Sequence, residues 1–174
     1  MRPGSSAEKL STEQQLYALA VRALTRRAHS IHEMRRYLER RAEGPAQVSA
    51  VIARLRTQDY LNDARYAIDY ARHQAQARRQ GRFRITGELR ARGVADDHID
   101  AALKSVFAET DETALVRARL KRHLAQLRGT LNERKARSLY RSLLRAGFSS
   151  DVIYGELRKT ARVDLPDSPG PEGE

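Results

Sequence analysis

The chain has 174 residues and a net charge of +11 at neutral pH, from 33 Lys and Arg against 22 Asp and Glu. Its length predicts one domain or a short array of small ones. Cys and Trp are absent, which excludes thiol catalysis, cysteine-ligated zinc and a disulfide framework. Charges interrupt every apolar stretch, and residues 1–6 lack the apolar core of a signal peptide. We therefore expect a soluble, cytoplasmic protein without a membrane span.

The first third of the chain predicts three helices. Thr12 with Gln15, and Ser30 with Glu33, each fit a capping box, in which two side chains satisfy free backbone amides at a helix start. The helix that follows Ser30 should run over about 31–42. Apolar residues recur at helical spacing in all three helices. These stripes are Leu16, Leu19, Ala20, Ala23 and Leu24; Ile31, Met34 and Leu38; and Val48, Val51, Ile52 and Leu55.

Glycine and proline mark the predicted helix ends. Gly44 fits a C-cap, and Pro45 fits the first turn of the next helix. The helix that begins at Asn62 or Asp63 should run through 78–79 and stop near Gly81. Later helices should end near Gly93, Gly129 and Gly147, and their stripes include Ile85 and Leu89; Ile99, Ala102, Leu103 and Val106; Val116, Leu120, Leu124 and Leu127; Ala136, Leu139, Tyr140 and Leu143; and Val152, Ile153 and Leu157.

The helix ends at Gly93 and Gly147 share a sequence pattern, and an Ile and a Leu follow each glycine at the same spacing. The first third matches more weakly through 38–42, with Ala42 in place of the glycine. We predict an all-α fold, an elongated, curved array of three tandem three-helix repeats, because stacked small units contact mainly their neighbours. The predicted bounds are 1–11 for a flexible N-terminus, 12–58, 59–108 and 109–162 for the three repeats, and 163–174 for a disordered acidic tail.

Basic charge is concentrated in the predicted repeats. Residues 109–162 hold 13 Lys and Arg against six Asp and Glu, whereas residues 163–174 hold four acids and no Lys or Arg. Such a surface attracts polyanions, and Arg pairs bidentately with phosphate. Genomic base composition is an equal explanation for the excess of Arg over Lys. An extended basic surface fits nucleic acid, or a protein filament formed on it.

Residues suited to catalysis or metal binding are scattered. His29 and His32 flank a predicted helix start and should not share one helical face. Asp96, Asp97 and Asp100 lie near another helix start, where they suit the positive end of the helix dipole. The sequence has no glycine-rich phosphate loop and no nucleophile elbow. We expect a protein that is not an enzyme, with no metal and no cofactor.

Four stretches form an ordered pattern. They are residues 16–39; Tyr60-Leu-Asn-Asp-Ala-Arg-Tyr-Ala; Gly81-Arg-Phe-Arg-Ile with Glu88-Leu and Gly93-Val; and Leu143 to Phe148 with Asp151-Val-Ile. In this order they resemble the RecX family of bacterial regulatory proteins, over about residues 13–159. The sequence departs from the family pattern at Asp59 and Ala42, which stand where the family has Gly, and at Asn62, which replaces an Asp. These changes affect turns and caps.

The resemblance implies a modulator of the RecA recombinase, built from three-helix repeats. Such a protein binds the RecA filament on single-stranded DNA and usually lowers its ATPase, strand-exchange and coprotease activities, which affects DNA repair and the SOS response. It also implies direct DNA binding in many members. Composition and periodicity alone indicate only a basic, repeated helical binding protein, for which we expect a monomer.

Arginines on exposed helix faces are the expected contacts to phosphate and to acidic protein surface. The densest group, at 78–92, also contains Phe83. The Phe83 ring could stack on a base, although packing between helices is the favoured expectation. The full set of candidates for binding the RecA filament or nucleic acid is Arg26, Arg27, Arg35, Arg36, Arg40, Arg78, Arg79, Arg82, Phe83, Arg84, Arg90, Arg92, Lys121, Arg122, Arg134, Arg137, Arg141 and Arg145.

Two other functions stay open. The main alternative is a helical DNA-binding protein that acts directly on nucleic acid, as a transcription factor does. Against it, no segment has a clear recognition helix rich in Asn, Gln and Arg after a tight turn. A structural adaptor is the third option. DNA binding with a sequence preference would favour the transcription factor, and salt-insensitive protein binding would favour the adaptor.

Overall fold

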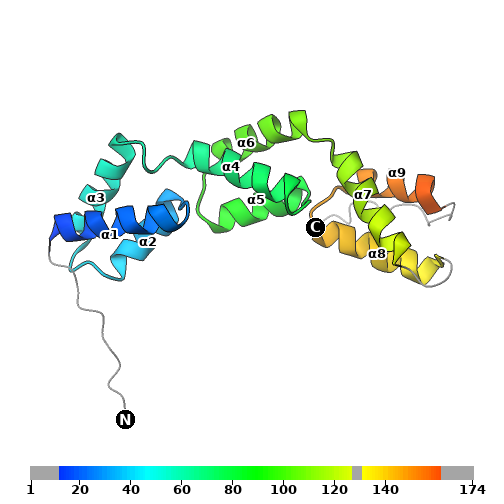
Figure 1. Cartoon of the computed structure of the whole chain (residues 1–174), viewed down its shortest axis with the longest axis horizontal. Helices are drawn as coiled ribbons and strands as arrows, with labels where there is room; N and C mark the ends of the chain where they lie inside the picture. The colour runs from blue at the N-terminus through cyan, green and yellow to red at the C-terminus, as the bar shows by residue number, and fades with distance from the viewer. Residues whose placement is uncertain (1–11, 127–130, 162–174) are drawn as a thin grey trace, which may run out of the picture. The chain divides into compact units, whose positions relative to one another are not determined.

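The computed structural model describes residues 12–126 and 131–161, which form nine α-helices and no β-strand (Figure 1). This confirms the all-α prediction. The predicted N-terminal segment 1–11 and acidic tail 163–174 lie outside the described residues. The helices are α1 (Glu13–Arg26), α2 (Ile31–Glu39), α3 (Pro45–Thr57), α4 (Asp63–Gln76), α5 (Arg82–Ala91), α6 (Asp96–Glu109), α7 (Glu112–Ala125), α8 (Glu133–Arg145) and α9 (Ser150–Ala161).

The chain divides into two compact units. Unit 1 consists of Met1–Asp69 and Leu89–Ala101, and unit 2 consists of Tyr70–Glu88 and Ala102–Glu174. Helices α4, α5 and α6 therefore contribute turns to both units. The bounds of the three repeats remain a prediction.

Unit 1 is built around α1, α2 and α3, which pack against one another (Figure 1). Each helix turns one apolar stripe inward, as the helical spacing predicts. Leu19, Leu24 and Ile31 are partly buried at the edge of this core. The buried members are Leu16, Ala20, Ala23, Met34, Leu38, Ala42, Val48, Val51, Ile52, Leu55 and Leu61.

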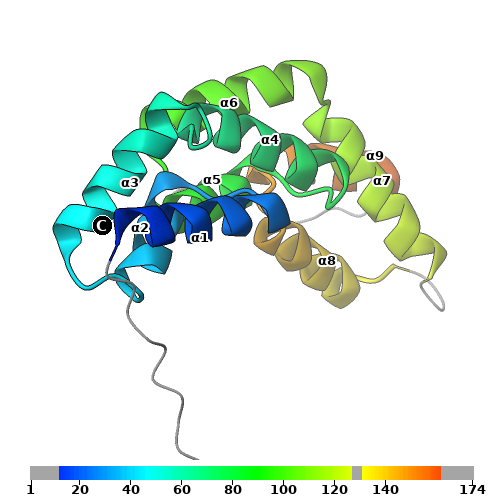
Figure 2. The same cartoon turned by 60° about the vertical axis from the view of Figure 1, so that its left-hand side comes forward.

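Unit 2 places α9 against both α7 and α8 (Figure 2). Phe148, in the link before α9, is 1% exposed and is the largest fully buried side chain. Leu124 is only half-buried, and Leu127 lies outside the described residues. The core residues are Val116, Leu120, Ala136, Leu139, Leu143, Ala146, Phe148, Ile153 and Leu157.

Both predicted capping boxes are present. The Gln15 amide donates to Thr12 Oγ1 at 3.2 Å, and the Thr12 amide donates to Gln15 Oε1 at 3.3 Å. The Glu33 amide donates to Ser30 Oγ at 3.0 Å, and the Ser30 amide donates to Glu33 Oε2 at 3.3 Å. Local side-chain chemistry therefore sets where α1 and α2 begin.

Gly93 and Gly147, which the sequence aligns, end their helices in the same way. Both have positive φ, +72° and +88° respectively. The next amide in each case reaches back to the helix, from Val94 to the Leu89 carbonyl at 3.2 Å and from Phe148 to the Leu143 carbonyl at 3.3 Å. This is the Schellman arrangement, which favours glycine because it has no Cβ to clash in the left-handed region.

The end of α2 differs from the prediction. The helix stops at Glu39 rather than near residue 42, and Gly44 is not its C-cap. Gly44 is instead the N-cap of α3, with φ −148° and Pro45 at the first helical position. A proline pushes the residue before it into the extended region, so Gly44 cannot form a left-handed cap.

Two later helices also end earlier than predicted. α4 stops at Gln76, because the Ala77 and Arg78 amides both bond to the His73 carbonyl, and Arg79 then adopts a left-handed φ of 52°. α7 ends at Ala125 rather than near residue 129. None of the helices in residues 12–126 and 131–161 combines the length and the hydrophobicity of a membrane span.

Candidate polyanion-binding surface

In unit 1, three of the predicted cations line one surface depression. Arg27, Arg36 and Arg40 surround it together with His29 and His32. Two further candidates, on the last turn of α1 and on α2, do not line it. Arg26 is exposed, and Arg35 Nη1 donates to Ser49 Oγ at 3.5 Å.

Glu33 partly neutralises the positive charge of this depression. Its Oε2 atom lies 3.1 Å from Arg27 Nη1, and its Oε1 atom lies 3.9 Å from Arg92 Nε. The Tyr66 hydroxyl also donates to Oε2 at 3.4 Å. The His29 ring is buried 4.0 Å from the same carboxylate, and burial and the Arg27 charge lower the His29 pKa although Glu33 opposes them. Glu33 therefore makes contacts that stabilise unit 1 and also reduces the positive charge of the depression.

The densest predicted group, at 78–92, is divided between the units, since Arg90 and Arg92 belong to unit 1. Most of its arginines have acidic partners. Arg82 Nε lies 3.0 Å from Glu112 Oε2, Arg84 Nε lies 2.9 Å from Glu88 Oε1, and Arg90 Nε lies 2.7 Å from Asp96 Oδ1. Arg78 is exposed and Arg79 half-buried, and no described carboxylate pairs with either. Sequence density alone therefore overstates how much free charge this segment presents.

Phe83 lies on the surface. Its side chain is 62% exposed, so the favoured expectation that it packs between helices is wrong. The Phe83 amide donates to the Gly147 carbonyl at 3.0 Å, which anchors the backbone while the ring faces solvent. The neighbouring Ile85 fills the core position of this helix start instead. An exposed ring between arginines is suited to stacking on a base.

The third group lies on α7 and α8. Arg134, Arg137 and Arg141 line a depression with Tyr140, and Arg137 pairs with Glu133 one turn earlier. The remaining members, Lys121, Arg122 and Arg145, are exposed.

Arg119 is a residue that the sequence prediction missed. Its guanidinium carbon lies 5.9 Å from the centre of the Phe148 ring, and its side chain is half-buried. Burial lowers the Arg119 pKa, and so do the positive charges of Arg122, Arg84 and Arg79. Its spacing of three residues from Arg122 on α7 was a signal in the sequence, but its contact with Phe148 was not.

Arg119 and the three residues whose charges lower its pKa, Arg79, Arg84 and Arg122, form the arginine cluster. They come from three segments of unit 2: the α4–α5 loop, α5 and α7. Arg84 Nη1 also donates to the Arg145 carbonyl at 3.3 Å, which holds α5 beside the end of α8. The only carboxylate that pairs with the cluster among the described residues is Glu88. The cluster therefore carries an excess of positive charge suited to phosphate or carboxylate groups.

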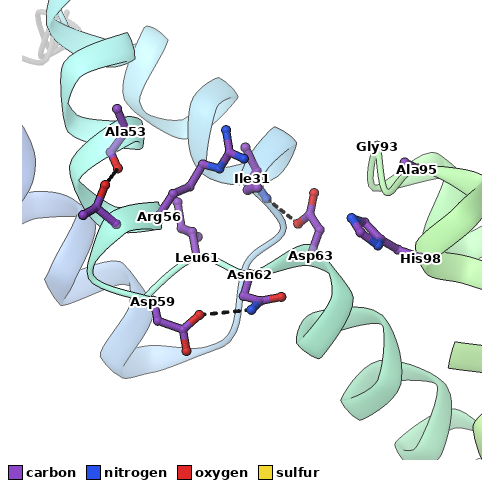
Figure 3. Close-up of a pocket in the computed structure, with 11 residues that line it drawn as sticks. Ile31, Ala53, Arg56, Asp59, Leu61, Asn62, Asp63, Gly93, Ala95 and His98 are labelled. Carbon is purple, nitrogen blue, oxygen red and sulfur yellow. Dashed lines mark hydrogen bonds between the residues drawn. The ribbon is translucent and has the colours of Figure 1, made fainter. Parts of the chain in front are cut away.

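The pocket in Figure 3, in unit 1, is unlike the arginine cluster because acids help to line it. Asp63 Oδ1 accepts from the Ile31 amide at 2.9 Å, and Asn62 Nδ2 donates to Asp59 Oδ1 at 3.0 Å. Asp59 has a left-handed φ of 55°, the conformation that the family pattern meets with glycine. These carboxylates are already used by the backbone and by neighbouring side chains. The pocket lies at the link between α3 and α4, and Arg56 and His98 line it beside these acids.

Metal ligands do not gather in the described part of the chain. No group of three or more His, Asp or Glu side chains there is placed to hold an ion. Asp96 and Asp97 lie in the first turn of α6, as predicted for acids near a helix start.

Comparison with known proteins agrees with the repeat architecture. Residues 17–55 match the model of the first RecX three-helix domain, and residues 62–103 match that of the second. The chain is 36% identical to the regulatory protein RecX of Halorhodospira halophila over 88% of this chain and 91% of that protein. It is 34% identical to the regulatory protein RecX of Deinococcus radiodurans over 95% and 78% of the two chains. The chain belongs to the RecX family.

Solved structures show the same fold. The crystal structure of RecX from Lactobacillus salivarius superposes with a TM-score of 0.72 at 21% identity, covering 87% of this chain and 97% of that one. The RecX domain matches contain the candidates on α1, α2 and α5, whereas Arg119 and Arg122 lie beyond residue 103, outside both.

Proposed function

We propose that this member of the RecX family is a non-enzymatic regulator that binds the RecA filament on single-stranded DNA. It lowers the ATPase, strand-exchange and coprotease activities of RecA, and thereby acts in DNA repair and the SOS response. Family membership supports the regulatory role, and the resemblance of the sequence to RecX proteins supports RecA as the partner. The observation that carries the proposal is the arginine cluster, whose positive charge exceeds that of its carboxylate partners.

The chemistry of the cluster suits a nucleoprotein filament. Such a filament presents phosphates and acidic side chains, and guanidinium groups bond to both in a charge-assisted way. Arg119 is half-buried among like charges, which raises its free energy in the unbound protein. An anion at this position relieves that repulsion, so binding is favoured most where the cluster is densest.

The test is RecA ATP hydrolysis on single-stranded DNA, titrated with the full chain up to the RecA concentration. The variant Arg119→Gln with Arg122→Gln should require at least about tenfold more protein for the same inhibition, because each lost contact to an anion costs roughly 1 kcal/mol. The matched control is Arg22→Gln with Lys104→Gln, which removes two exposed charges outside the cluster. Equal loss in both variants would show that only net charge matters. No inhibition by the unmodified chain would overturn the regulatory proposal.

Direct action on nucleic acid is a second candidate, favoured by the exposed Phe83 ring. Fluorescence anisotropy with labelled single-stranded and duplex oligonucleotides separates the two functions. A preference for one duplex sequence would favour a transcription factor. Sequence-independent binding to single strands, with inhibition of RecA at protein concentrations too low to cover the DNA, favours the filament regulator.

A further inference from the structure

The surface depression of unit 1 has an excess of positive charge in its lining. Three arginines, two histidines and one glutamate contribute to it, which leaves two positive charges when both histidines are neutral. These residues are Arg27, Arg36, Arg40, His29, His32 and Glu33. The volume of about 290 Å³ lies at the lower limit of small-ligand pockets, so the depression suits one compact anionic group.

Arg36 and Arg40 carry charge that no carboxylate in the described part of the chain neutralises. Both side chains are exposed, and neither forms an ion pair there. They are four residues apart, Arg36 in the last turn of α2 and Arg40 at its C-cap, so the two cations share one face and repel each other. An anion that contacts both guanidinium groups removes this repulsion.

Arg27 and His29 compete for the carboxylate of Glu33. Its Oε2 atom lies 3.1 Å from Arg27 Nη1 but 4.0 Å from His29 Nδ1, which is beyond hydrogen-bond distance. The His29 side chain is only 8% exposed, and Nδ1 is buried without a hydrogen-bond partner among the described residues. Buried polar atoms usually have partners. In the unbound protein the carboxylate is therefore held by Arg27, and the histidine is left without it.

We propose that the unit 1 depression binds a phosphate dianion, either inorganic phosphate or the terminal monoester of a nucleic-acid strand. Arg27, Arg36 and Arg40 hold the anion. The Glu33 carboxylate, released by Arg27, then accepts a hydrogen bond from Nδ1 of protonated His29, so the protein takes up a proton with the anion. This site goes beyond the proposed function, which depends on the arginine cluster of unit 2, and either can fail without the other.

The groups around His29 set the direction of this coupling. Burial and the Arg27 charge lower the His29 pKa, and Glu33 opposes them. An anion on Arg27 weakens the effect of that cation and frees Glu33, so the His29 pKa rises. Glu33 keeps two other contacts, to Arg92 Nε at 3.9 Å and to the Tyr66 hydroxyl at 3.4 Å, so the carboxylate stays beside the histidine.

Two other rings lie close to His29. His32 is exposed and lines the same depression, and the centre of the Tyr37 ring lies 6.1 Å from that of His29. His32 also gains from an anion in the depression. The pH dependence of affinity therefore does not distinguish the two histidines, and each ring has to be followed by its own NMR signals.

The test is an NMR titration of the full chain with sulfate. Sulfate stays doubly charged across the titration range of histidine, whereas a phosphate monoester gains a proton near about pH 6. Sulfate should shift the signals of Arg36 and His29 saturably, and chloride at matched ionic strength should not. The pH midpoint of the His29 ring should be higher in saturating sulfate than in chloride. An unchanged midpoint despite saturable binding would overturn the exchange of Glu33 from Arg27 to His29.

A pair of charge variants tests the location of the site. Arg36→Gln with Arg40→Gln should raise the sulfate Kd at least about tenfold, because it removes two charge-assisted contacts. The matched control is Arg22→Gln with Arg56→Gln, which removes two exposed charges from α1 and α3 of the same unit. The control should change the Kd by less than about twofold. Equal weakening in the two variants would show that only net charge matters and would overturn the site.

Three further probes, each followed at the His29 ring, identify the source of the phosphate. They are inorganic phosphate, tetrathymidylate with a 5′-phosphate, and tetrathymidylate with a 5′-hydroxyl. A preference for the phosphorylated strand that is lost with Arg36→Gln and Arg40→Gln assigns the site to strand ends. Binding of inorganic phosphate, with no difference between the strands, assigns it to the free anion.

Two outcomes with these probes would overturn the inference. Tighter binding of both strands than of inorganic phosphate, equal between the strands and dependent on Arg36 and Arg40, would show a site for phosphodiesters. No saturable response to sulfate or to any of the three probes would show that the depression binds no anion. Neither outcome changes the expected result of the RecA assay, which tests the proposed function separately.

Discussion

The Gly81 amide donates a 2.8 Å hydrogen bond to the Ala146 carbonyl, which joins the α4–α5 loop of unit 2 directly to the end of α8. A Cβ on Gly81 would overlap the Gly147 carbonyl, and a Cβ on Gly147 would overlap the backbone of Arg84. The two glycines therefore allow two backbones to touch. This contact places Arg84 in the arginine cluster and leaves the Phe83 ring in solvent.

Substitution of these glycines should destabilise the protein. Gly147→Ala should lower the free energy of unfolding by at least about 2 kcal/mol, because it combines a steric clash with a strained positive φ. Urea unfolding followed by circular dichroism measures the change. Gly87→Ala and Gly155→Ala are the controls, since nothing lies near their Cβ positions in α5 and α9. Both should stabilise by roughly 0.5–1 kcal/mol, and destabilisation by either would contradict this interpretation.

Arg119→Met should stabilise the fold while weakening anion binding. The folded state disfavours the Arg119 cation through burial and the neighbouring positive charges, so an apolar side chain over Phe148 should raise the free energy of unfolding by roughly 1 kcal/mol at low salt. The gain should shrink as salt screens the repulsion. Urea unfolding at two salt concentrations, beside oligonucleotide titrations, checks both effects. A loss of stability that is independent of salt would show that the cation supports the fold.

Glu156 should make the stability of unit 2 sensitive to acid. This buried carboxylate accepts from Arg117 Nε at 2.8 Å and Lys159 Nζ at 3.1 Å, and the Arg117 hydrogen bond is the main reason that its pKa is lowered. A lowered pKa means that the stabilisation is present above the ordinary glutamate value near 4.3 and is lost as the pH falls through the folded value. Glu156→Gln should cost roughly 1 to 2 kcal/mol at pH 7.

The decisive comparison for Glu156 is the pH profile of urea unfolding between pH 7 and 3. The glutamine variant should lose less stability over the acidic end than the unmodified chain. Parallel profiles for the two proteins would show that other carboxylates account for acid sensitivity.

His29 should also make the protein less stable as the pH falls, but at a higher pH than Glu156 does. Burial and Arg27 lower its pKa, so the folded protein keeps the ring neutral where the unfolded chain is already protonated. This contribution to stability is fully present above the ordinary histidine pKa of about 6.5 and is lost as the pH falls toward the lower pKa of the folded protein. The total loss is about 1.4 kcal/mol for each pH unit by which folding lowers the His29 pKa. An NMR titration of the His29 ring should give a midpoint below 6.5. A midpoint above that value would mean that Glu33 outweighs burial.

Phe83→Ala should leave stability almost unchanged and weaken binding to single strands. The ring is 62% exposed, so its removal should change the free energy of unfolding by no more than about 0.5 kcal/mol. If the ring stacks on a base, affinity for an oligothymidylate should fall by about 1–3 kcal/mol. Phe83→Tyr, which keeps the ring, should retain affinity. Equal affinity of the alanine variant and the unmodified chain would remove Phe83 from the binding surface.

Local signals in the sequence were sufficient to predict most of the helices. The capping residues Thr12 and Ser30 form bonds within one helical turn, and the apolar stripes follow from helical spacing alone. The matching ends at Gly93 and Gly147 were also predictable, because a left-handed cap is a property of one residue and its own helix. The predicted helix ends were wrong where a neighbouring residue changed the backbone conformation. At Gly44, the following proline imposes an extended backbone.

The candidate site depended on tertiary structure. The sequence was enough to predict an all-helical, basic chain with arginines on exposed faces, since composition and periodicity are local quantities. It did not determine which of these arginines are already paired with acids 30 residues away, as Arg82 is with Glu112. Nor did it determine that Arg119 lies over Phe148 among three other cations. Only packing brings together charges from distant segments, and the balance of those charges decides where an anion binds.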